Sequence, residues 1–557
     1  MQIVIPMSGF GERFRRAGYA VPKPLIEIDG RPIIAHVIDM FPGERDFIFI
    51  CNQDHLDDPE YRMAAVLRQY CPTGRIIGIP PHKLGPIHAV RQVEHLIDPA
   101  LPVIVNYCDF TCFWDWEHFK QFVAAIACAG AIPAYKDFHP HTLGSTNYAY
   151  MREINGWVQD IQEKQPYTQN RMEEFASSGT YYFASGKIMS EAFRATMEQD
   201  LNVNGEYYVS LAYKPLLAAS AQIAVYPLQH FMQWGTPEDV AEYNCWSDTF
   251  RRLIAAEAAP TAPQGAVVVP MAGLGQRFAN EGYSVTKPLI PVSGKPMVAQ
   301  ATHDLPVAIY YVFVLRSDMP GHQEISGELK RIYAHAVIKT ISGVTEGQAC
   351  TALIGLEALE HVNGSAPGPI TFGACDNGAL YDAKAFQQLL DNPEVDVIVW
   401  GVRGHANAAR NPKMFGWIDA DEKNKIRKIS VKTPLEAPVT DPIVLGTFTF
   451  RRAKDFHRVV EHLIARDGRI NGEFYIDSCI NDALDLGLRC HLFEVGSFLS
   501  WGTPNDLRTF EYWQSCFHNW KGHPYRLELD GRIPHGALRS LEERYKAIEP
   551  KLPGIHV

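Results

Sequence analysis

The chain has 557 residues, which exceeds what one hydrophobic core supports and fits two domains of roughly 250 residues each. Hydrophobic residues make up 46% and charged residues 21%, the proportions of a folded globular protein, which argues against extensive disorder. The formal net charge of -11 argues against a broad basic surface, so we expect neither nucleic acid nor a membrane as a partner. The sequence has no long apolar run and no signal-like opening, and we therefore expect a cytoplasmic protein.

Short apolar runs alternate with stretches of helical spacing along the chain. The runs at residues 2–5, 46–50, 102–106 and 223–226 predict buried strands, and the spacing at 61–70 and 116–129 predicts helices. This alternation is typical of an α/β fold in which helices flank a mainly parallel sheet, a Rossmann-like arrangement. Ligands of such sheets bind at the carboxyl ends of the strands.

An internal repeat divides the chain. The segment from Pro6 to Pro32 recurs from Pro270 to Pro296, with 15 of 27 aligned positions identical, which chance does not produce. The register then holds to the end of each copy, where it pairs Asp109 with Asp376, Asn204 with Asn471 and Trp234 with Trp501. We predict tandem domains at 1–254 and 265–515, joined by a linker at 255–264 and followed by a C-terminal extension at 516–557.

A glycine turn follows the first predicted strand of each copy, at Gly9 and Gly11 and again at Gly273 and Gly275. The missing side chains allow backbone amides to approach phosphate oxygens. The turn is not a dinucleotide fingerprint, because a phenylalanine stands where the third glycine is required, and it lacks the GK[ST] of a P-loop. An arginine follows two residues later and a lysine ten residues further on, and two cations beside such a turn suit a triphosphate.

With these motifs, the chain resembles the sugar-1-phosphate nucleotidyltransferases, the nucleoside-diphosphate-sugar pyrophosphorylases, whose opening signature is GxGxR followed by KP. The resemblance covers nearly the whole chain, twice, up to about residue 515, and implies two Rossmann-like, GT-A-like domains. It implies that the phosphates of the nucleotide are held by the catalytic cations Arg13, Lys23, Arg277 and Lys287. It further implies that Asp109 and Asp376, each after a central strand, bind Mg²⁺ together with phosphate oxygens.

The resemblance also assigns residues to the acceptor and to the base. The acceptor residues it implies are Glu163, Lys164, Gly179, Glu206, Lys432, Gly446 and Glu473, and those near the nucleotide base are Gly85, Gly347 and Gln348. Glu206 and Glu473 are assigned to acceptor hydroxyls or to indirect support of the metal. The second copy has Val431 where the first has the acid Glu163, and the base loops also differ. These differences allow the two copies to prefer different nucleotides or acceptors.

One departure from the family concerns the metal. The family often places a second magnesium-binding acid two residues before the final Gly-Thr-Pro, whereas Gln233 and Ser500 stand there in this chain. Neither side chain is an effective anionic ligand. We expect the metal to be held weakly without nucleotide.

The implied reaction transfers a nucleoside monophosphate from a nucleoside triphosphate to a sugar 1-phosphate or a similar phosphorylated small molecule, with release of pyrophosphate. By resemblance, the product serves the synthesis of a capsule or another surface polysaccharide. The alternatives are a cytidylyltransferase for a non-sugar phosphate such as a phosphoalcohol or phosphocholine, and a chain in which one repeat binds nucleotide without catalysis. A glycosyltransferase is disfavoured because residues 109–111 and 376–378 supply one acid each rather than a pair. A homo-oligomer is compatible with the sequence.

Overall fold

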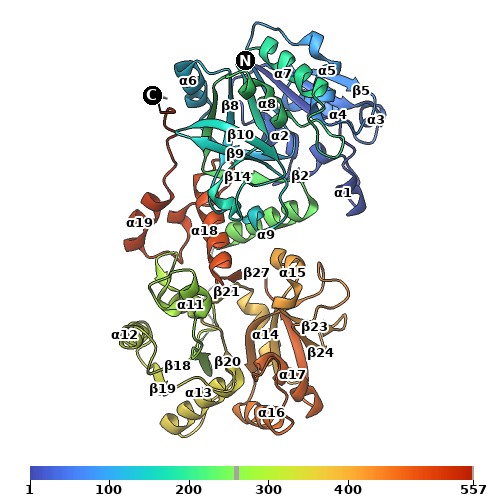
Figure 1. Ribbon diagram of the computed structural model, residues 1–557. Coiled ribbons are helices and arrows are strands. Elements are labelled where there is room, and N and C mark those ends of the chain that lie inside the picture. The colour runs from blue at the N-terminus through green and yellow to red at the C-terminus, as the bar shows by residue number, and fades with distance from the viewer. Residues whose placement is uncertain (256–261, 555–557) are drawn as a thin grey trace. The chain divides into compact units, whose positions relative to one another are not determined.

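The computed structural model describes residues 1–255 and 262–554, which form two compact units (Figure 1). Unit 1 comprises Met1–Asn244 together with the described end of the chain from Lys546, and unit 2 comprises Cys245–Tyr545. The division falls inside helix α9 (Pro237–Leu253), upstream of the boundary predicted at 254. Residues 256–261 of the predicted linker lie outside the described residues.

Unit 1 is built on one sheet of ten strands, which includes the first strand of the chain, β1 (Gln2–Met7). β1 is parallel to its neighbours β4 and β6. The order across the sheet is β11 (Phe175–Ser177), β9 (Ala149–Ile154), β10 (Trp157–Glu163), β13 (Ile223–Leu228), β8 (Gly130–Tyr135), β12 (Thr180–Phe183), β6 (Val103–Asn106), β1, β4 (Asp46–Asn52) and β5 (Arg75–Ile79).

Unit 2 has its own sheet, and the strand order from β13 to β5 in unit 1 is repeated there from β26 to β19. Its path runs through β19 (Val337–Ile341), β18 (Tyr310–Arg316), β15 (Ala266–Pro270), β20 (Ile370–Phe372), β25 (Ile443–Phe450), β22 (Val397–Val402) and β26 (Cys490–Glu494). The hairpin of β23 (Gly416–Ala420) and β24 (Ile426–Val431) pairs with β25 beside this path. The two units therefore share one strand order.

Both sheets are mixed, which corrects the expectation of a mainly parallel sheet. β12 runs antiparallel to both of its neighbours, β6 and β8, and β25 does the same between β20 and β22. The hairpins β9–β10 and β23–β24 add further antiparallel pairs. Strands that are buried on both faces read as apolar runs in either direction, so their composition does not reveal the reversal.

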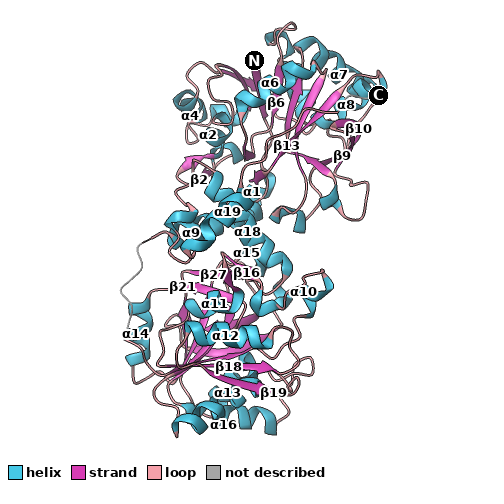
Figure 2. Ribbon diagram, turned by 90° about the vertical axis from the view of Figure 1, so that its left-hand side faces the viewer, coloured by secondary structure: helices cyan, strands magenta, loops and turns pink. Residues whose placement is uncertain are grey.

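Helices cover both faces of each sheet. Along β15, Val268 packs with α13 (Gln348–Asn363) and α16 (Ala453–Ala465), whereas Val267 and Val269 pack with α11 (Met297–His303) and α12 (His322–Ile332). Figure 2 shows α13 and α16 together below the strands of unit 2. Successive strand residues point to opposite faces, which explains why this strand is apolar throughout.

Both units contain further helices of eight or more residues. They are α4 (Met63–Tyr70), α6 (Trp116–Ile126) and α7 (Gly186–Glu198) in unit 1, and α14 (Ala383–Asp391), α17 (Ile476–Asp485), α18 (Pro504–Asn519) and α19 (His535–Tyr545) in unit 2. Among the helices of the described part of the chain, none is long and apolar enough to cross a membrane.

The C-terminal extension divides between the units. Within unit 2, Arg532 forms an ion pair of 2.7 Å with Asp304, and both side chains are buried. Within unit 1, the amide of Gly554 donates to the carbonyl of Asn155 at 2.8 Å, and the Trp157 indole donates to the carbonyl of Gly554. The predicted start of the extension, residue 516, lies inside α18.

Candidate active site

A cleft of about 630 Å³ opens at the carboxyl ends of β1 and β6 in unit 1. This is the size of a typical small-molecule site and the position expected for the ligand of an α/β sheet. The cleft brings together most of the residues that the sequence assigned to the first site, namely Gly9, Gly11, Arg13, Lys23, Gly85, Asp109, Glu163, Lys164 and Glu206.

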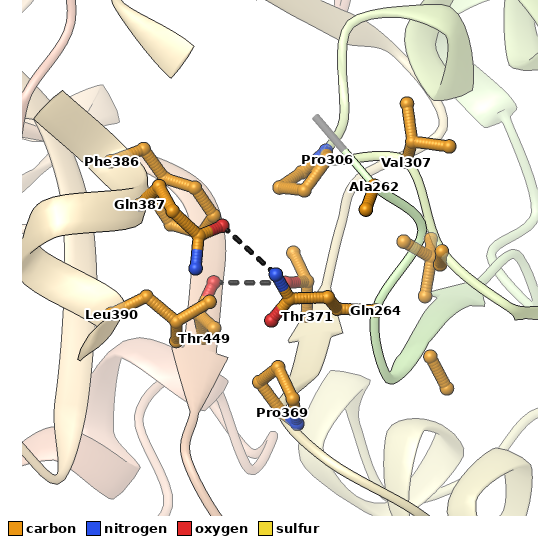
Figure 3. Close-up of a pocket in the computed structure, with 13 residues that line it drawn as sticks. Ala262, Gln264, Pro306, Val307, Pro369, Thr371, Phe386, Gln387, Leu390 and Thr449 are labelled. Atoms are coloured by element: carbon orange, nitrogen blue, oxygen red, sulfur yellow. Dashed lines mark hydrogen bonds between the residues drawn. The ribbon is translucent and has the colours of Figure 1, made fainter. Parts of the chain in front are cut away.

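A second, much smaller cavity lies at the opposite ends of the strands in unit 2. Figure 3 shows it beside Gln264, whose side chain donates to Gln387 at 3.2 Å. Its volume of about 20 Å³ has room for roughly one water molecule, so it cannot hold a nucleotide.

The glycine turn after β1 is open on its outer side. Gly11 has a φ of +62° and precedes the short helix α1 (Glu12–Arg16), and Gly275 has a φ of +64° before α10 (Gln276–Asn280). A Cβ built on Gly9 or Gly273 would meet no atom within 4 Å. The glycines thus provide both the left-handed turn and an unobstructed approach to the backbone.

Beside each turn, the predicted lysine and aspartate form an ion pair. Lys23 Nζ lies 2.8 Å from Asp109 Oδ2, and Lys287 Nζ lies 2.5 Å from Asp376 Oδ2. Burial alone would lower the pKa of Lys23, but the Asp109 carboxylate outweighs this effect and the net shift is upward. Lys23 therefore keeps its positive charge in the cleft.

A two-stranded ribbon holds each of these aspartates. In unit 1, β7 (Phe110–Phe113) pairs with β14 (His230–Gln233), and the amide of Trp234 donates to the carbonyl of Asp109 at 2.8 Å. In unit 2, β21 (Asn377–Leu380) pairs with β27 (Ser497–Ser500) in the same way. The glycine of the Trp-Gly-Thr-Pro motif makes room for two polar side chains, because a Cβ on Gly235 would lie 2.7 Å from Gln233 Nε2 and 3.2 Å from Asp109 Oδ2. The sequence analysis had noted this motif without assigning its glycine a role.

The donor set suits a metal that is completed by its substrate. Gln233 and Ser500 pair across these ribbons with the residues that follow the two aspartates. Among the described residues, no group of three or more His, Cys, Asp or Glu side chains is arranged to hold a metal ion. A single carboxylate per site fits Mg²⁺ when phosphate oxygens and water supply the other ligands.

The predicted base loop is joined to the Asn-Gly-Glu segment. Gly85 has a φ of +85°, and a Cβ there would lie 2.6 Å from the amide nitrogen of Tyr207. The amide of Tyr207 donates to the carbonyl of Leu84 at 3.0 Å, and the amide of Ile87 donates back to the carbonyl of Tyr207 at 3.1 Å. Gly347, just before Gln348 at the start of α13, packs against Phe474 in the same manner. Only glycine fits this junction.

The repeated Asn-Gly-Glu segment forms a tight turn. Asn204 and Gly205 both have positive φ, as do Asn471 and Gly472, and this is the geometry of a type I′ hairpin turn. Asn-Gly therefore recurs for a structural reason. Glu206 lines the cleft and accepts a hydrogen bond from the Tyr208 hydroxyl, whereas Glu473 is exposed.

The side of the cleft that is predicted to bind the acceptor contains a half-buried acid next to a lysine. Ser210 Oγ donates to Glu163 Oε2 at 2.6 Å, and Lys164 Nζ lies 2.5 Å from the Tyr208 hydroxyl. Burial raises the pKa of Glu163 to about 7, with Ser210 and Lys164 acting in the opposite direction and Glu206 adding to the rise. Glu163 is therefore poised between its neutral and ionised forms near neutral pH.

The two predicted acceptor glycines differ in how closely they are packed. A Cβ on Gly179 would be 3.0 Å from Phe110 and 3.1 Å from Tyr107, whereas one on Gly446 would be 3.8 Å from Asn377. In unit 2, Lys432 donates to the carbonyl of Met414. Burial lowers its pKa, Asp477 opposes that shift, and the charge of Arg277 adds to it, which places Arg277 and Lys432 in one cationic neighbourhood.

Several residues that line the cleft were not predicted from the sequence, among them the loop residues His82 and Lys83. His82 and Lys83 follow β5, where His82 Nε2 lies 3.3 Å from Ser8 Oγ and Lys83 Nζ lies 2.8 Å from Glu12 Oε1. These contacts tie the loop after β5 to the glycine turn. The sequence of this loop does not recur in the second copy, so the internal repeat gives no signal for it.

No family model matches the chain. The Bifunctional protein GlmU of Burkholderia orbicola (strain MC0-3) is 34% identical over 110 residues, which is 20% of this chain and 22% of the relative. GlmU of Paraburkholderia xenovorans (strain LB400) is 24% identical over 250 residues, which is 42% of this chain and 48% of the relative. The chain thus spans less than half the length of these curated relatives.

Solved structures also match parts of the chain. The nucleoside-diphosphate-sugar pyrophosphorylase of Vibrio cholerae RC9 is 20% identical, and the match covers 44% of this chain and 98% of that chain with a TM-score of 0.37. Each of these three matches covers less than half of this chain.

Proposed function

We propose that the chain is a tandem nucleotidyltransferase in which each unit joins a nucleoside monophosphate to a phosphorylated acceptor. The main observation in support is that a Lys–Asp ion pair lies beside a glycine turn in both units, at Lys23–Asp109 and at Lys287–Asp376. In unit 1 this pair lines a cleft of about 630 Å³, which is large enough for a nucleotide. The sugar nucleotide so formed would serve the synthesis of a surface polysaccharide.

The charges of the cleft suit phosphate. Arg13, Arg16, Lys23 and Lys83 line the side that carries the glycine turn, although the whole chain has a net charge of -11. A local cluster of cations can neutralise a triphosphate without making the protein basic overall. The acids Glu163 and Glu206 lie with Lys164 on the acceptor side, where hydroxyl groups need acceptors.

The reaction is an in-line displacement. An acceptor phosphate oxygen forms a bond to the α-phosphorus, the bond from that phosphorus to the bridging oxygen breaks, and pyrophosphate leaves with the electron pair. Arg13 and Lys23 neutralise the charge that develops, the glycine turn binds phosphate oxygens, and Lys164 holds the acceptor phosphate. Mg²⁺ bound by Asp109 and by phosphate oxygens would add further charge neutralisation. No general base is needed, because the attacking oxygen is already ionised.

A second candidate is a cytidylyltransferase for a phosphocholine-like acceptor. The Lys164 ammonium already lies over the Tyr208 ring, 4.3 Å from its centroid, so this ring can accept a cation on its face. Tyr107, Glu163 and Glu206 line the same side of the cleft. Aromatic rings and carboxylates are the groups that recognise a quaternary ammonium.

Pyrophosphate release by the full chain tests the proposal. The assay would combine each common nucleoside triphosphate and Mg²⁺ with a panel of sugar phosphates, phosphoalcohols and phosphocholine. We expect release with at least one pair, and its loss in the double variant Lys23→Ala with Lys287→Ala. Lys214→Ala is the matched control, because Lys214 pairs with Asp160 at 3.0 Å but does not line the cleft. Equal release by wild type and the double variant would refute the assignment.

A further inference from the structure

The acceptor sides of the two units differ at one acid. In unit 1, Glu163 ends β10 and pairs across the hairpin with Ala149. In unit 2, Val431 ends β24 at the matching place and pairs with Gly416. The lysine that follows is retained, and Lys164 and Lys432 share a left-handed backbone, with φ of +60° and +59°. From its hairpin alone, unit 2 would lack the acceptor carboxylate.

A different acid lies beside the gap. Asp477 stands near the start of α17, and a Cβ built on Gly416 would lie 2.5 Å from its Oδ2 atom. The Asp477 carboxylate is therefore next to the Gly416–Val431 pair, where the side chain of Glu163 begins in unit 1. An alanine at 416 would collide with it, so the glycine is what admits the carboxylate.

Three positions change together between the units. Counting from the Asn-Gly-Glu turns, Asp477 corresponds to Ser210, the residue whose hydroxyl donates to Glu163. Unit 1 thus combines alanine, glutamate and serine where unit 2 combines glycine, valine and aspartate. The changes compensate one another. In unit 2 the carboxylate is on the helix residue Asp477 instead of on the hairpin, and the hairpin residue that faces it is a glycine instead of an alanine.

The charged groups around Asp477 suit a ligand-binding site and not only an acid at the start of a helix. Burial raises the pKa of Asp477 to about 6, and the nearby Lys432 ammonium lowers it. Arg277 acts on the same lysine. Within residues 262–554, no ion pair and no side-chain donor engages the Asp477 carboxylate, and its own backbone amide is the hydrogen-bond donor that lowers its pKa.

We propose that Asp477 supplies in unit 2 the acceptor-binding carboxylate that Glu163 supplies in unit 1. The inference rests on the proposed function and deepens it. Because the carboxylate comes from α17 instead of the hairpin, it meets the acceptor from a different side. The two units would therefore bind phosphorylated polyols that differ in the position of the hydroxyl they present.

The test uses the full chain with Asp109→Ala, which silences unit 1, and compares Asp477→Asn with Asp485→Asn. Asp485 is an exposed residue of the same helix, so its variant controls for the loss of a charge on α17. We expect Asp477→Asn to raise the KM for the acceptor about 10- to 100-fold, the value of one or two charge-assisted hydrogen bonds, without changing the KM for the triphosphate. The triple variant Gly416→Ala, Val431→Glu, Asp477→Ser carries the arrangement of unit 1, so it should not regain affinity for the acceptor of unit 2 and should gain affinity for the acceptor of unit 1. An unchanged acceptor KM in Asp477→Asn would overturn the inference.

If the proposed function itself is wrong, the pyrophosphate assay gives a result that differs from failure of the Asp477 inference. If the Asp109→Ala chain releases no pyrophosphate with any pair, the transfer reaction fails for unit 2. Equilibrium dialysis of glucose 1-phosphate against the same proteins then decides the inference. Binding that is lost in Asp477→Asn and kept in Asp485→Asn supports it, and equal or absent binding in all three proteins overturns it.

Discussion

Lys23 Nζ lies 2.8 Å from Asp109 Oδ2, so in the structure the cation expected to bind nucleotide phosphate neutralises the acid expected to bind Mg²⁺. Both side chains are about one quarter exposed, with values of 26% and 25%, so a ligand can reach them from the cleft. Binding of a magnesium-bound triphosphate can exchange this pair for two new ones, lysine with phosphate and aspartate with metal.

Loss of either cation of unit 1 should slow that unit strongly. We expect Arg13→Ala and Lys23→Ala, each made in an Asp376→Ala chain so that only unit 1 reports, to lower its rate about 100- to 1,000-fold, the usual effect of removing one preorganised charge. Steady-state pyrophosphate release measures the change, with Lys214→Ala as the control. Full activity in either cation variant would contradict the assigned role.

Metal binding should depend on the nucleotide. With one carboxylate per site, and with Gln233 and Ser500 in place of a second acid, we expect no saturable binding of Mn²⁺, used as a spectroscopic substitute for Mg²⁺, until a triphosphate is added. Electron paramagnetic resonance of free Mn²⁺ measures this binding. Stoichiometric binding to the protein alone, retained in Asp109→Ala with Asp376→Ala, would show that the metal site lies elsewhere.

Gly85 should be irreplaceable at its junction with Tyr207. Gly85→Ala would combine the cost of a left-handed backbone, roughly 1–2 kcal/mol, with a clash of the new Cβ at 2.6 Å, roughly another 1–3 kcal/mol. Gly18→Ala is the matched control, because Gly18 has a φ of +87° but no atom within 4 Å of its Cβ position. Thermal unfolding should show the larger loss for Gly85→Ala, and equal losses would mean that the contact with Tyr207 is not tight.

The acceptor affinity of unit 1 should depend on pH through Glu163. Its pKa of about 7 means that the carboxylate ionises as the pH rises through neutrality, and the ionised form accepts hydroxyl hydrogen bonds better. In an Asp376→Ala chain we expect the acceptor KM to fall between pH 6 and pH 8. Adding Glu163→Gln should remove the part of this fall that comes from ionisation of Glu163. The acceptor phosphate titrates equally with both proteins, so the difference between them reports Glu163. Identical profiles would contradict this role.

The raised pKa of Glu163 also affects the stability of the folded chain. A carboxyl whose pKa is higher in the folded chain than in the unfolded chain favours folding while it is protonated, and that contribution is lost as the pH rises from its ordinary value of 4.5 toward 7. Glu163→Gln should therefore raise the melting temperature at pH 8 more than at pH 5. A larger gain at pH 5 would have the opposite sign to the one expected.

Local requirements of the backbone and of burial were readable from the sequence. The apolar runs at 46–50 and 223–226 form β4 and β13, since a strand covered on both faces needs apolar residues throughout. The left-handed turns at Gly11 and Gly275 follow from the glycine pattern. The turn formed by Asn204 and Gly205 could have been recognised as well, because Asn-Gly is the strongest type I′ signal.

Features that depend on tertiary pairing were not readable. The direction of β12 between β6 and β8 leaves no mark on its composition. Asp477 could not be predicted because its counterpart, Ser210, carries no charge, and only the cross-strand pairing of Gly416 with Val431 places the carboxylate beside the position that matches Glu163. Alignment of the two copies reveals what they share, whereas their difference lies in residues that meet only in the folded chain.

The most direct test of the account is pyrophosphate release by the full chain with Mg²⁺ across the triphosphates and the acceptor panel, repeated with Asp109→Ala and with Asp376→Ala. The account predicts release with two substrate pairs, one abolished by each substitution, because each unit has its own Lys–Asp pair and its own acceptor carboxylate. If both substitutions abolished release with the same substrate pair, the two units would not be two distinct sites. If release persisted in the variant that carries both substitutions, the assigned aspartates would not belong to the active site.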